Sequence, residues 1–217
     1  MPEHMVSILL TQKGKKMSNE PKIFLTSDTH WFHENVIQYC NRPWQDIDQM
    51  GRGLVKNWNN VVRKKDIVYH LGDVAMGGPK RMDDLNKILN QLNGTIRLIR
   101  GNHDTYIMKE PCVNRFEWVK DYHELKYTSP NHGKRKFILC HYPLLTWNGS
   151  GRKAKDGNPY SVMLHGHCHG NIDDRNRDTT RMDMGVDSNN YAPIWIENIV
   201  ELMNHKTYDP VDHHAGH

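Results

Sequence analysis

The sequence lacks the patterns that mark secreted and membrane proteins. Only four cysteines occur in 217 residues, and none forms a C-x-x-C pair, so no disulfide framework is indicated. No apolar run approaches the roughly 20 residues that a membrane-spanning helix needs. The apolar stretch at 6–10 is too short for a secretory core, and no small-residue cleavage site follows it. We therefore expect a cytoplasmic protein with reduced cysteines.

A strong charge of either sign is also absent. The formal net charge is +4 and the pI is near 8.8, which mildly favours anionic partners. This excess does not choose between a small phosphate ester and a nucleic acid.

The length and composition suit one domain. With 37% hydrophobic residues, a chain of 217 residues can bury one substantial core. We expect an N-terminal extension over 1–20, a single domain over 21–205 and a tail over 206–217. Met17 would serve equally well as the natural start.

Five short polar motifs each follow a short apolar run. Apolar strands that end in metal-type ligands indicate one site at the carboxyl edge of a sheet. The motifs, in chain order, are Asp28-Thr29-His30, Gly72-Asp73, Gly101-Asn102-His103-Asp104, His141 and Gly166-His167-Cys168-His169.

The spacing inside two of these motifs places a pair of side chains on one face. Positions i and i+2 of an extended segment lie on one face, so Asp28 and His30 can bind the same ion. His167 and His169 repeat this spacing. Taken singly, each motif has an ordinary alternative, such as a helix-capping aspartate or a polar turn. The five motifs together favour the metal site.

Apolar periodicity predicts alternating strands and helices, followed by a hairpin. The segment 106–120 is ambiguous because Pro111 argues against one continuous helix. The segment 144–160 has no regular period and suits either a lid or a solvated loop. We expect helices over 33–37, 46–64, 82–92 and 194–203, and strands over 23–27, 66–73, 95–100, 123–128, 135–141, 161–167 and 182–186.

The ordered set D-x-H, G-D, G-N-H-D, H and G-H-x-H resembles the calcineurin-like metallophosphoesterase superfamily, in particular its compact single-domain prokaryotic and phage members. The resemblance covers 23–201. It implies an α/β fold, namely a four-layer α-β-β-α sandwich of two mixed sheets flanked by helices. It also implies a phosphoric ester hydrolase that favours phosphodiesters, with a nucleotide or oligonucleotide among the candidate substrates. Attack by a hydroxide that bridges two metal ions is the implied reaction.

The resemblance also implies a ligand set for two divalent transition-metal ions. Asp73 would bridge the ions. Mn²⁺ is the choice by family analogy, and Fe²⁺, Zn²⁺, Co²⁺ or Ni²⁺ also suit this mixed set, whereas four histidines argue against Mg²⁺. One ion would be held by Asp28, His30, Asp73 and His169, and the other by Asp73, Asn102, His141 and His167.

Two residues of the G-N-H-D turn are catalytic candidates. His103 is adjacent to Asn102, so its side chain should point elsewhere, toward the substrate. There it would stabilise developing charge or protonate the leaving alkoxide. Asp104 would hold the His103 imidazole in its productive tautomer.

The residues that bind substrate are harder to assign. Arg42, His33 and Asn35 follow the first motif and would line the phosphate pocket, although helix capping and surface charge explain them equally well. Four aromatic residues flank the motifs, where they would either stack on a base or pack in the core. These are Trp31, Phe32, Tyr142 and Trp147.

Two alternatives to a phosphoesterase of small esters remain. A continuous basic groove would favour a nucleic-acid end-processing nuclease or phosphatase, and no strong basic-aromatic stripe occurs in the sequence. A non-catalytic scaffold on the same fold is the other alternative. The presence of His103 and of all seven expected ligands argues against that scaffold.

Overall fold

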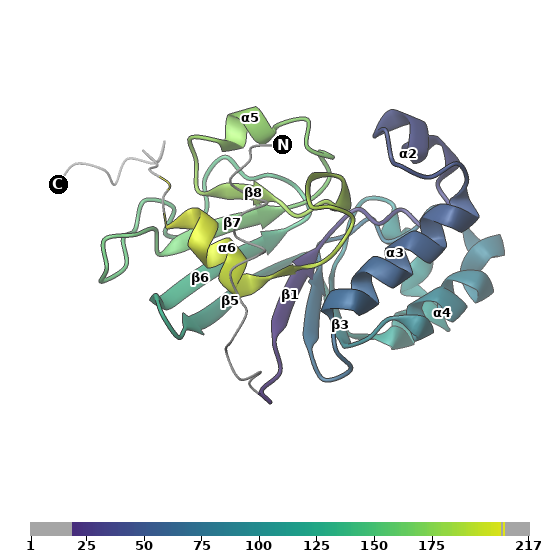
Figure 1. Ribbon diagram of the computed structural model, residues 1–217, viewed down its shortest axis with the longest axis horizontal. Helices are drawn as coiled ribbons and strands as arrows, with labels where there is room; N and C mark the ends of the chain where they lie inside the picture. Colours follow the sequence, from purple (N-terminus) through teal and green to yellow (C-terminus); the bar gives the residue numbers. More distant parts are fainter. Residues whose placement is uncertain (1–18, 205, 207–217) are drawn as a thin grey trace.

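The computed structural model describes residues 19–204 and 206, which form two mixed β-sheets with helices packed around them (Figure 1). The expected 21–205 domain lies almost wholly in this range, whereas most of the expected extension and tail lies outside it. The larger sheet has the order β4-β3-β2-β1-β9 and the smaller sheet the order β5-β6-β7-β8. The strands are β1 (Ile23–Thr26), β2 (Ile67–His70), β3 (Thr95–Ile99), β4 (Phe116–Lys120), β5 (Tyr122–Ser129), β6 (Gly133–Cys140), β7 (Ser161–His165), β8 (Arg181–Asp183) and β9 (Ile194–Trp195).

Strand direction brings the motifs to one edge of each sheet. In the larger sheet β1, β2, β3 and β4 run parallel, and β9 pairs antiparallel with β1. In the smaller sheet β6, β7 and β8 run parallel, and β5 pairs antiparallel with β6. The carboxyl ends of parallel strands share an edge, so the polar residues that follow them lie close together. The expected fold with two mixed sheets is confirmed.

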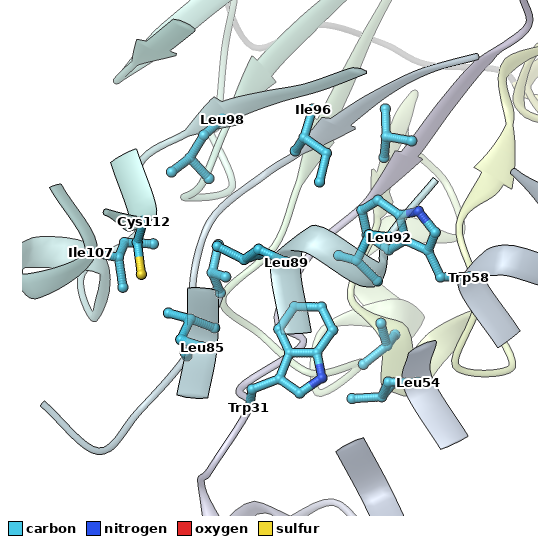
Figure 2. Packing of buried hydrophobic residues seen from close by; sticks show 14 of the residues in the cluster. Trp31, Leu54, Trp58, Leu85, Leu89, Leu92, Ile96, Leu98, Ile107 and Cys112 are labelled. Carbon is cyan, nitrogen blue, oxygen red and sulfur yellow. The ribbon is translucent and has the colours of Figure 1, made fainter. Parts of the chain in front are cut away.

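Helices cover the outer face of the larger sheet. The side chain of Asp46 accepts a 2.7 Å hydrogen bond from the Gln49 backbone N–H and so caps the start of α3. The apolar sides of α3 and α4 then pack on strand residues such as Ile96 and Leu98 (Figure 2). The helices are α2 (Glu34–Tyr39), α3 (Ile47–Val61), α4 (Met82–Gln91), α5 (Asp173–Asn176) and α6 (Ile196–Met203), and the 3₁₀ turns are η1 (Pro79–Arg81), η2 (Asp104–Met108), η3 (Cys112–Arg115) and η4 (Val186–Ser188).

A second core lies between the two sheets. Alternate residues of a strand point to opposite faces, so Phe24 joins the helix-covered core while Leu25 joins this inner one. In the smaller sheet, Phe137 and Leu139 point inward in the same way. The apolar face of α6, which includes Ile199, closes the same cluster. This packing holds the two motif-bearing edges next to each other.

Three segments differ from the pattern expected from the sequence. The expected strand over 182–186 ends at Asp183 as β8, and Val186 begins the 3₁₀ turn η4. The ambiguous stretch 106–120 forms two 3₁₀ turns and then β4, which pairs with β3. The expected helix over 194–203 begins two residues late, because Ile194 and Trp195 pair with β1 as β9. Both strands exist through pairing with distant residues, which local periodicity does not report.

The segment 144–160 packs against the smaller sheet. Trp147 is buried against Ile138 and Met163 on the outer face of that sheet. The Asn148 backbone carbonyl also accepts a 2.9 Å hydrogen bond from the Ser161 hydroxyl. The start of the segment is therefore anchored, as a packed loop would be. Among the residues described, no helix is both long and apolar enough to cross a membrane.

Candidate metal centre

The expected ligands meet where the two sheets adjoin. Asp28, Asp73 and Asn102 follow β1, β2 and β3 of the larger sheet, whereas His141 and His167 follow β6 and β7 of the smaller one. Backbone hydrogen bonds join these turns: the Asp28 N–H donates to the Gly72 carbonyl at 3.0 Å. The Asp28 carboxylate accepts the His167 N–H at 3.0 Å, which ties the two sheets together at the site.

The backbone at the site adopts a conformation that side chains rarely take. Left-handed φ values cost a non-glycine residue about 1–3 kcal/mol each, and such strain gathers at functional sites. Aspartate and histidine tolerate this region better than most residues. Five of the seven expected ligands have such φ values: Asp28 (55°), His30 (51°), Asp73 (55°), His167 (70°) and His169 (49°).

The Asp73 carboxylate lies between two groups of ligands. Its Oδ2 atom is 3.4 Å from His141 Nε2 and 3.6 Å from His30 Nε2. Its Oδ1 atom accepts the His103 backbone N–H at 2.9 Å, which holds the carboxylate in this orientation. One oxygen therefore faces imidazoles from both sheets.

The first group gathers around His30. Its Nε2 atom is 3.8 Å from Asp28 Oδ1, and His169 Nε2 is 4.0 Å from the same oxygen. Both ring nitrogens of His30 are buried without a hydrogen-bond partner. A buried polar atom without a partner costs about 1–3 kcal/mol, which a bound cation would offset. These residues therefore fit a metal ion.

Burial also sets the protonation states in the first group. Burial lowers the pKa of His30 to about 2, so its imidazole is neutral, as a metal ligand must be. Burial raises the pKa of Asp28 to about 7, although His141 and His169 oppose the change. A carboxylate buried at such cost is the kind of group that a cation stabilises.

The second group gathers around His141. Its Nδ1–H donates to the Leu71 carbonyl at 2.8 Å, which leaves Nε2 to face the site. That Nε2 atom is 3.0 Å from Asn102 Oδ1 and also faces Asp73 Oδ2, and both of these oxygens are acceptors. A proton or a cation must lie among these atoms. The ligand atoms of Asp73, His141 and His167 lie within 4.8 Å of one another.

Glycines allow the loops to approach the two carboxylates. A Cβ atom on Gly101 would lie 2.2 Å from Asp73 Oδ1, and one on Gly166 would lie 2.4 Å from Asp28 Oδ2. Any other residue at these positions would displace one of these carboxylates.

The two catalytic candidates of the G-N-H-D turn lie in different surroundings. The His103 side chain is 40% exposed and its Nε2 is 3.9 Å from Asp73 Oδ2, so it faces the open side of the site. Asp104 is buried, and its two carboxylate oxygens accept the backbone N–H groups of Gly101, Asp73 and Val74 at 2.8–2.9 Å. Asp104 was expected to hold the His103 imidazole, but its carboxylate bonds to these backbone groups instead. Asp104 therefore stabilises the conformation of the turn.

The three substrate-binding candidates differ in burial and in their neighbours. The Arg42 guanidinium is buried and donates to Asp187 and to two backbone carbonyls, which corrects the expectation that it lines the phosphate pocket. The His33 ring lies 5.4 Å from the His30 ring, and burial lowers its pKa, with His103 adding to the effect. Asn35 is exposed in the first turn of α2.

The aromatic residues that flank the motifs divide into core and surface. Trp31 and Trp147 are buried in apolar clusters, which assigns them to packing. Phe32 is half-buried, with the Arg81 guanidinium 5.4 Å from its ring centre. Tyr142 remains 47% exposed, and its ring lies 4.9 Å from that of His167.

The structure adds one residue that the motif analysis missed. Asp187 Oδ2 lies 2.7 Å from His169 Nδ1. A signal for it exists, because Asp187 follows the apolar run expected as the strand 182–186, as the other motif residues follow their strands. With Cys40 and His169, Asp187 also forms a third group whose potential ligand atoms lie within 4.8 Å.

Comparisons with known proteins identify relatives of this chain and a solved structure with its fold. The protein MJ1445 of Methanocaldococcus jannaschii is 37% identical over 186 residues, which cover 84% of this chain and 91% of the relative. The Gene 66 protein of Mycobacterium phage D29 is 31% identical over 168 residues, covering 72% and 81%. The solved structure of the Aquifex aeolicus protein AQ665 has the same fold, with a TM-score of 0.63 at 23% identity, covering 84% and 100%.

A family model gives the assignment. The model for the calcineurin-like phosphoesterase superfamily domain matches residues 22–186. This range holds all seven expected metal ligands. The chain therefore belongs to the calcineurin-like phosphoesterase superfamily.

Proposed function

We propose that this protein is a dinuclear metal-dependent phosphoesterase that hydrolyses phosphodiesters, nucleotide-type esters among them. The observation that carries the proposal is the position of Asp73 Oδ2, which lies within 3.6 Å of Nε2 atoms from both ligand groups. A single carboxylate oxygen in that position suits a bridge between two ions. Asp28, His30 and His169 would complete one ion's shell.

The remaining residues would hold the second ion and supply a proton. Asn102, His141 and His167 would hold the second ion together with Asp73. Bound together, two such ions polarise phosphoryl oxygens and activate water for in-line attack. The mixed set of histidine, carboxylate and amide ligands suits Mn²⁺ or another first-row ion. His103, on the exposed side, would donate a proton to the leaving oxygen.

An exposed aromatic ring supports a nucleotide-type substrate. Tyr142 lies at the edge of the site, with its ring 5.1 Å from that of His141. The Tyr142 side chain is 47% exposed, so its ring is accessible for stacking on a base.

Replacement of Tyr142 tests this stacking role. Stacking on one base is worth about 1–3 kcal/mol, so Tyr142→Ala should raise KM for a 2′,3′-cyclic nucleotide by roughly 5–150-fold. Tyr142→Phe keeps the ring and serves as the matched control, with KM expected near the wild-type value. An unchanged KM in the alanine variant would contradict the stacking role.

The function itself is tested by a panel of esters. Metal-free protein is loaded with Mn²⁺ and assayed on bis-p-nitrophenyl phosphate, p-nitrophenyl phosphate, 2′,3′-cyclic nucleotides and short oligonucleotides. We expect Mn²⁺-dependent hydrolysis that is faster on diesters than on the monoester and stops with EDTA. Turnover of oligonucleotides alone would favour the nuclease. No turnover of any ester by the loaded protein would favour the non-catalytic scaffold.

A further inference from the structure

The His169 imidazole is held from outside the candidate metal site. Its Nδ1 atom is 2.7 Å from Asp187 Oδ2, while its Nε2 atom faces Asp28 Oδ1 at 4.0 Å. A carboxylate on one ring nitrogen fixes the tautomer and the ring orientation that the other nitrogen needs to bind a metal. Asp187 is therefore placed to orient the His169 imidazole.

Asp187 is in turn held by Arg42. The guanidinium Nε donates to Oδ1 at 2.7 Å, and a terminal nitrogen donates to Oδ2 at 2.9 Å, a two-point geometry that restricts the carboxylate plane. Both side chains are nearly inaccessible to solvent, with 0% and 5% exposed. The carboxylate therefore has little freedom to turn away from His169.

Arg42 also contacts the first motif directly. Its terminal nitrogens donate to the Thr29 carbonyl at 2.9 Å and to the Asp28 carbonyl at 2.8 Å. One guanidinium therefore links the backbone of the ligand Asp28 with the carboxylate that orients the ligand His169. Lysine has one ammonium group and no planar fork, so it cannot reproduce these contacts.

A different interpretation is a third metal site made of Cys40, His169 and Asp187, whose ligand atoms lie within 4.8 Å of one another. The charge of Arg42 argues against it. Both Asp187 oxygens already accept guanidinium N–H groups, so a cation there would meet a buried positive charge. The arrangement suits orientation of His169 rather than binding of another ion.

We propose that Asp187 and Arg42 are positioning residues that orient His169 and Asp28 for one metal ion, an inference that rests on the proposed dinuclear site. Neither residue would touch the substrate. Their loss would weaken one of the two ions selectively, because their hydrogen bonds reach His169 and the backbone of Asp28, which belong to the first ligand group.

The test is titration of the metal-free full-length protein with Mn²⁺ by isothermal calorimetry. Loss of an outer carboxylate partner typically weakens metal binding about 10–100-fold, so Asp187→Asn should show one site weakened by that factor. Asp156→Asn is the control, because it removes the carboxylate charge beside another buried arginine, Arg135, which lies near the start of β6, whereas His141 follows the end of that strand. We expect Asp156→Asn to leave both affinities unchanged.

Two further variants separate positioning from general damage to the fold. Asp187→Glu keeps a carboxylate and should bind Mn²⁺ more tightly than Asp187→Asn, while Arg42→Lys should weaken the same site. Metal-free melting curves accompany each titration and report any loss of fold stability in each variant.

The outcomes distinguish this inference from the proposed function. Two wild-type Mn²⁺ sites that stay unchanged in Asp187→Asn would overturn the positioning role alone. Equal losses in Asp187→Asn, Asp187→Glu and Asp156→Asn would also overturn it. A wild-type protein that binds fewer than two Mn²⁺ ions would overturn the dinuclear site and this inference with it.

Discussion

At the scale of single residues, neighbours in the G-N-H-D turn have different partners. Asn102 Oδ1 lies 3.0 Å from His141 Nε2, within the second ligand group. The next side chain, His103, is partly exposed on the open side. This divergence would separate the proposed metal ligand Asn102 from His103, which is proposed to reach the substrate.

His103→Ala tests that separation. The variant should keep two metal ions yet lose roughly 10²–10⁴-fold in rate on an ester with an alkoxide leaving group. The loss should be smaller with p-nitrophenolate, which leaves without a proton. Rates on both esters and metal content by elemental analysis measure the effect. Equal losses on both would remove the general-acid role, and a lost metal would make His103 a ligand.

The residue scale also shows what a sequence can reveal about the site. The seven expected ligands follow strands whose apolar runs are visible, so their convergence could be predicted. The partners of Arg42 and Asp104 could not. Arg42 bonds to Asp187, 145 positions away, and Asp104 bonds to the backbone of Asp73 and Val74, about 30 positions away. Local patterns contain no information about such pairings.

At the scale of elements, Asp66 joins the starts of β1 and β2. The Asp66 carboxylate is buried and accepts the backbone N–H groups of Lys22 and Arg63 at 2.9 and 2.8 Å. Burial would raise its pKa, but the Arg63 guanidinium and these N–H groups outweigh it, so the pKa of Asp66 lies below its usual range. The ionised Asp66 carboxylate therefore stabilises the folded state.

Asp66→Asn should lower the free energy of unfolding at neutral pH. The loss is about 1–3 kcal/mol, because an amide leaves one of the buried donors without an acceptor. Because the pKa of Asp66 is lower in the folded state, ionised Asp66 contributes to the free energy of unfolding above about pH 4. That contribution disappears as pH falls through the pKa of Asp66 in the folded state. Urea unfolding of both proteins at pH 7 and pH 3 measures the difference. A difference that stays the same at pH 3 would contradict this account.

The element scale also explains the parts of the fold that the sequence did not predict. The strands β1, β2 and β3 carry runs of apolar residues, and their predicted and observed bounds agree within three residues at each end. The strand β9 has only two residues and continues directly into α6, so its sequence reads as helix. These two residues form a strand because their backbone pairs antiparallel with β1.

At the scale of the whole molecule, the candidate site joins the two sheets. Asp73 comes from the larger sheet and His141 from the smaller, and both would hold the same ion. Metal ions bound there would link the two layers as well as activate water. Stability and metal content should therefore change together.

Metal removal tests this linkage. A ligand at 100 times its Kd stabilises a fold by about 2.7 kcal/mol. For a domain of this size each kcal/mol shifts Tm by about 2–4 °C, so EDTA should lower Tm by roughly 5–11 °C. Differential scanning calorimetry measures the shift, and restored Mn²⁺ should reverse it. An unchanged Tm in protein shown to be metal-free would contradict the linkage.

The measurement that tests the central claim most directly is the metal content of Asp73→Asn. The wild-type protein, loaded with Mn²⁺ and freed of excess metal, should contain two ions per chain. Asp73→Asn removes charge from the oxygen that faces both ligand groups, so both ions should be depleted while the fold stays largely intact. Asp156→Asn should retain two. Elemental analysis that finds two ions per chain in Asp73→Asn as well would contradict the bridging role.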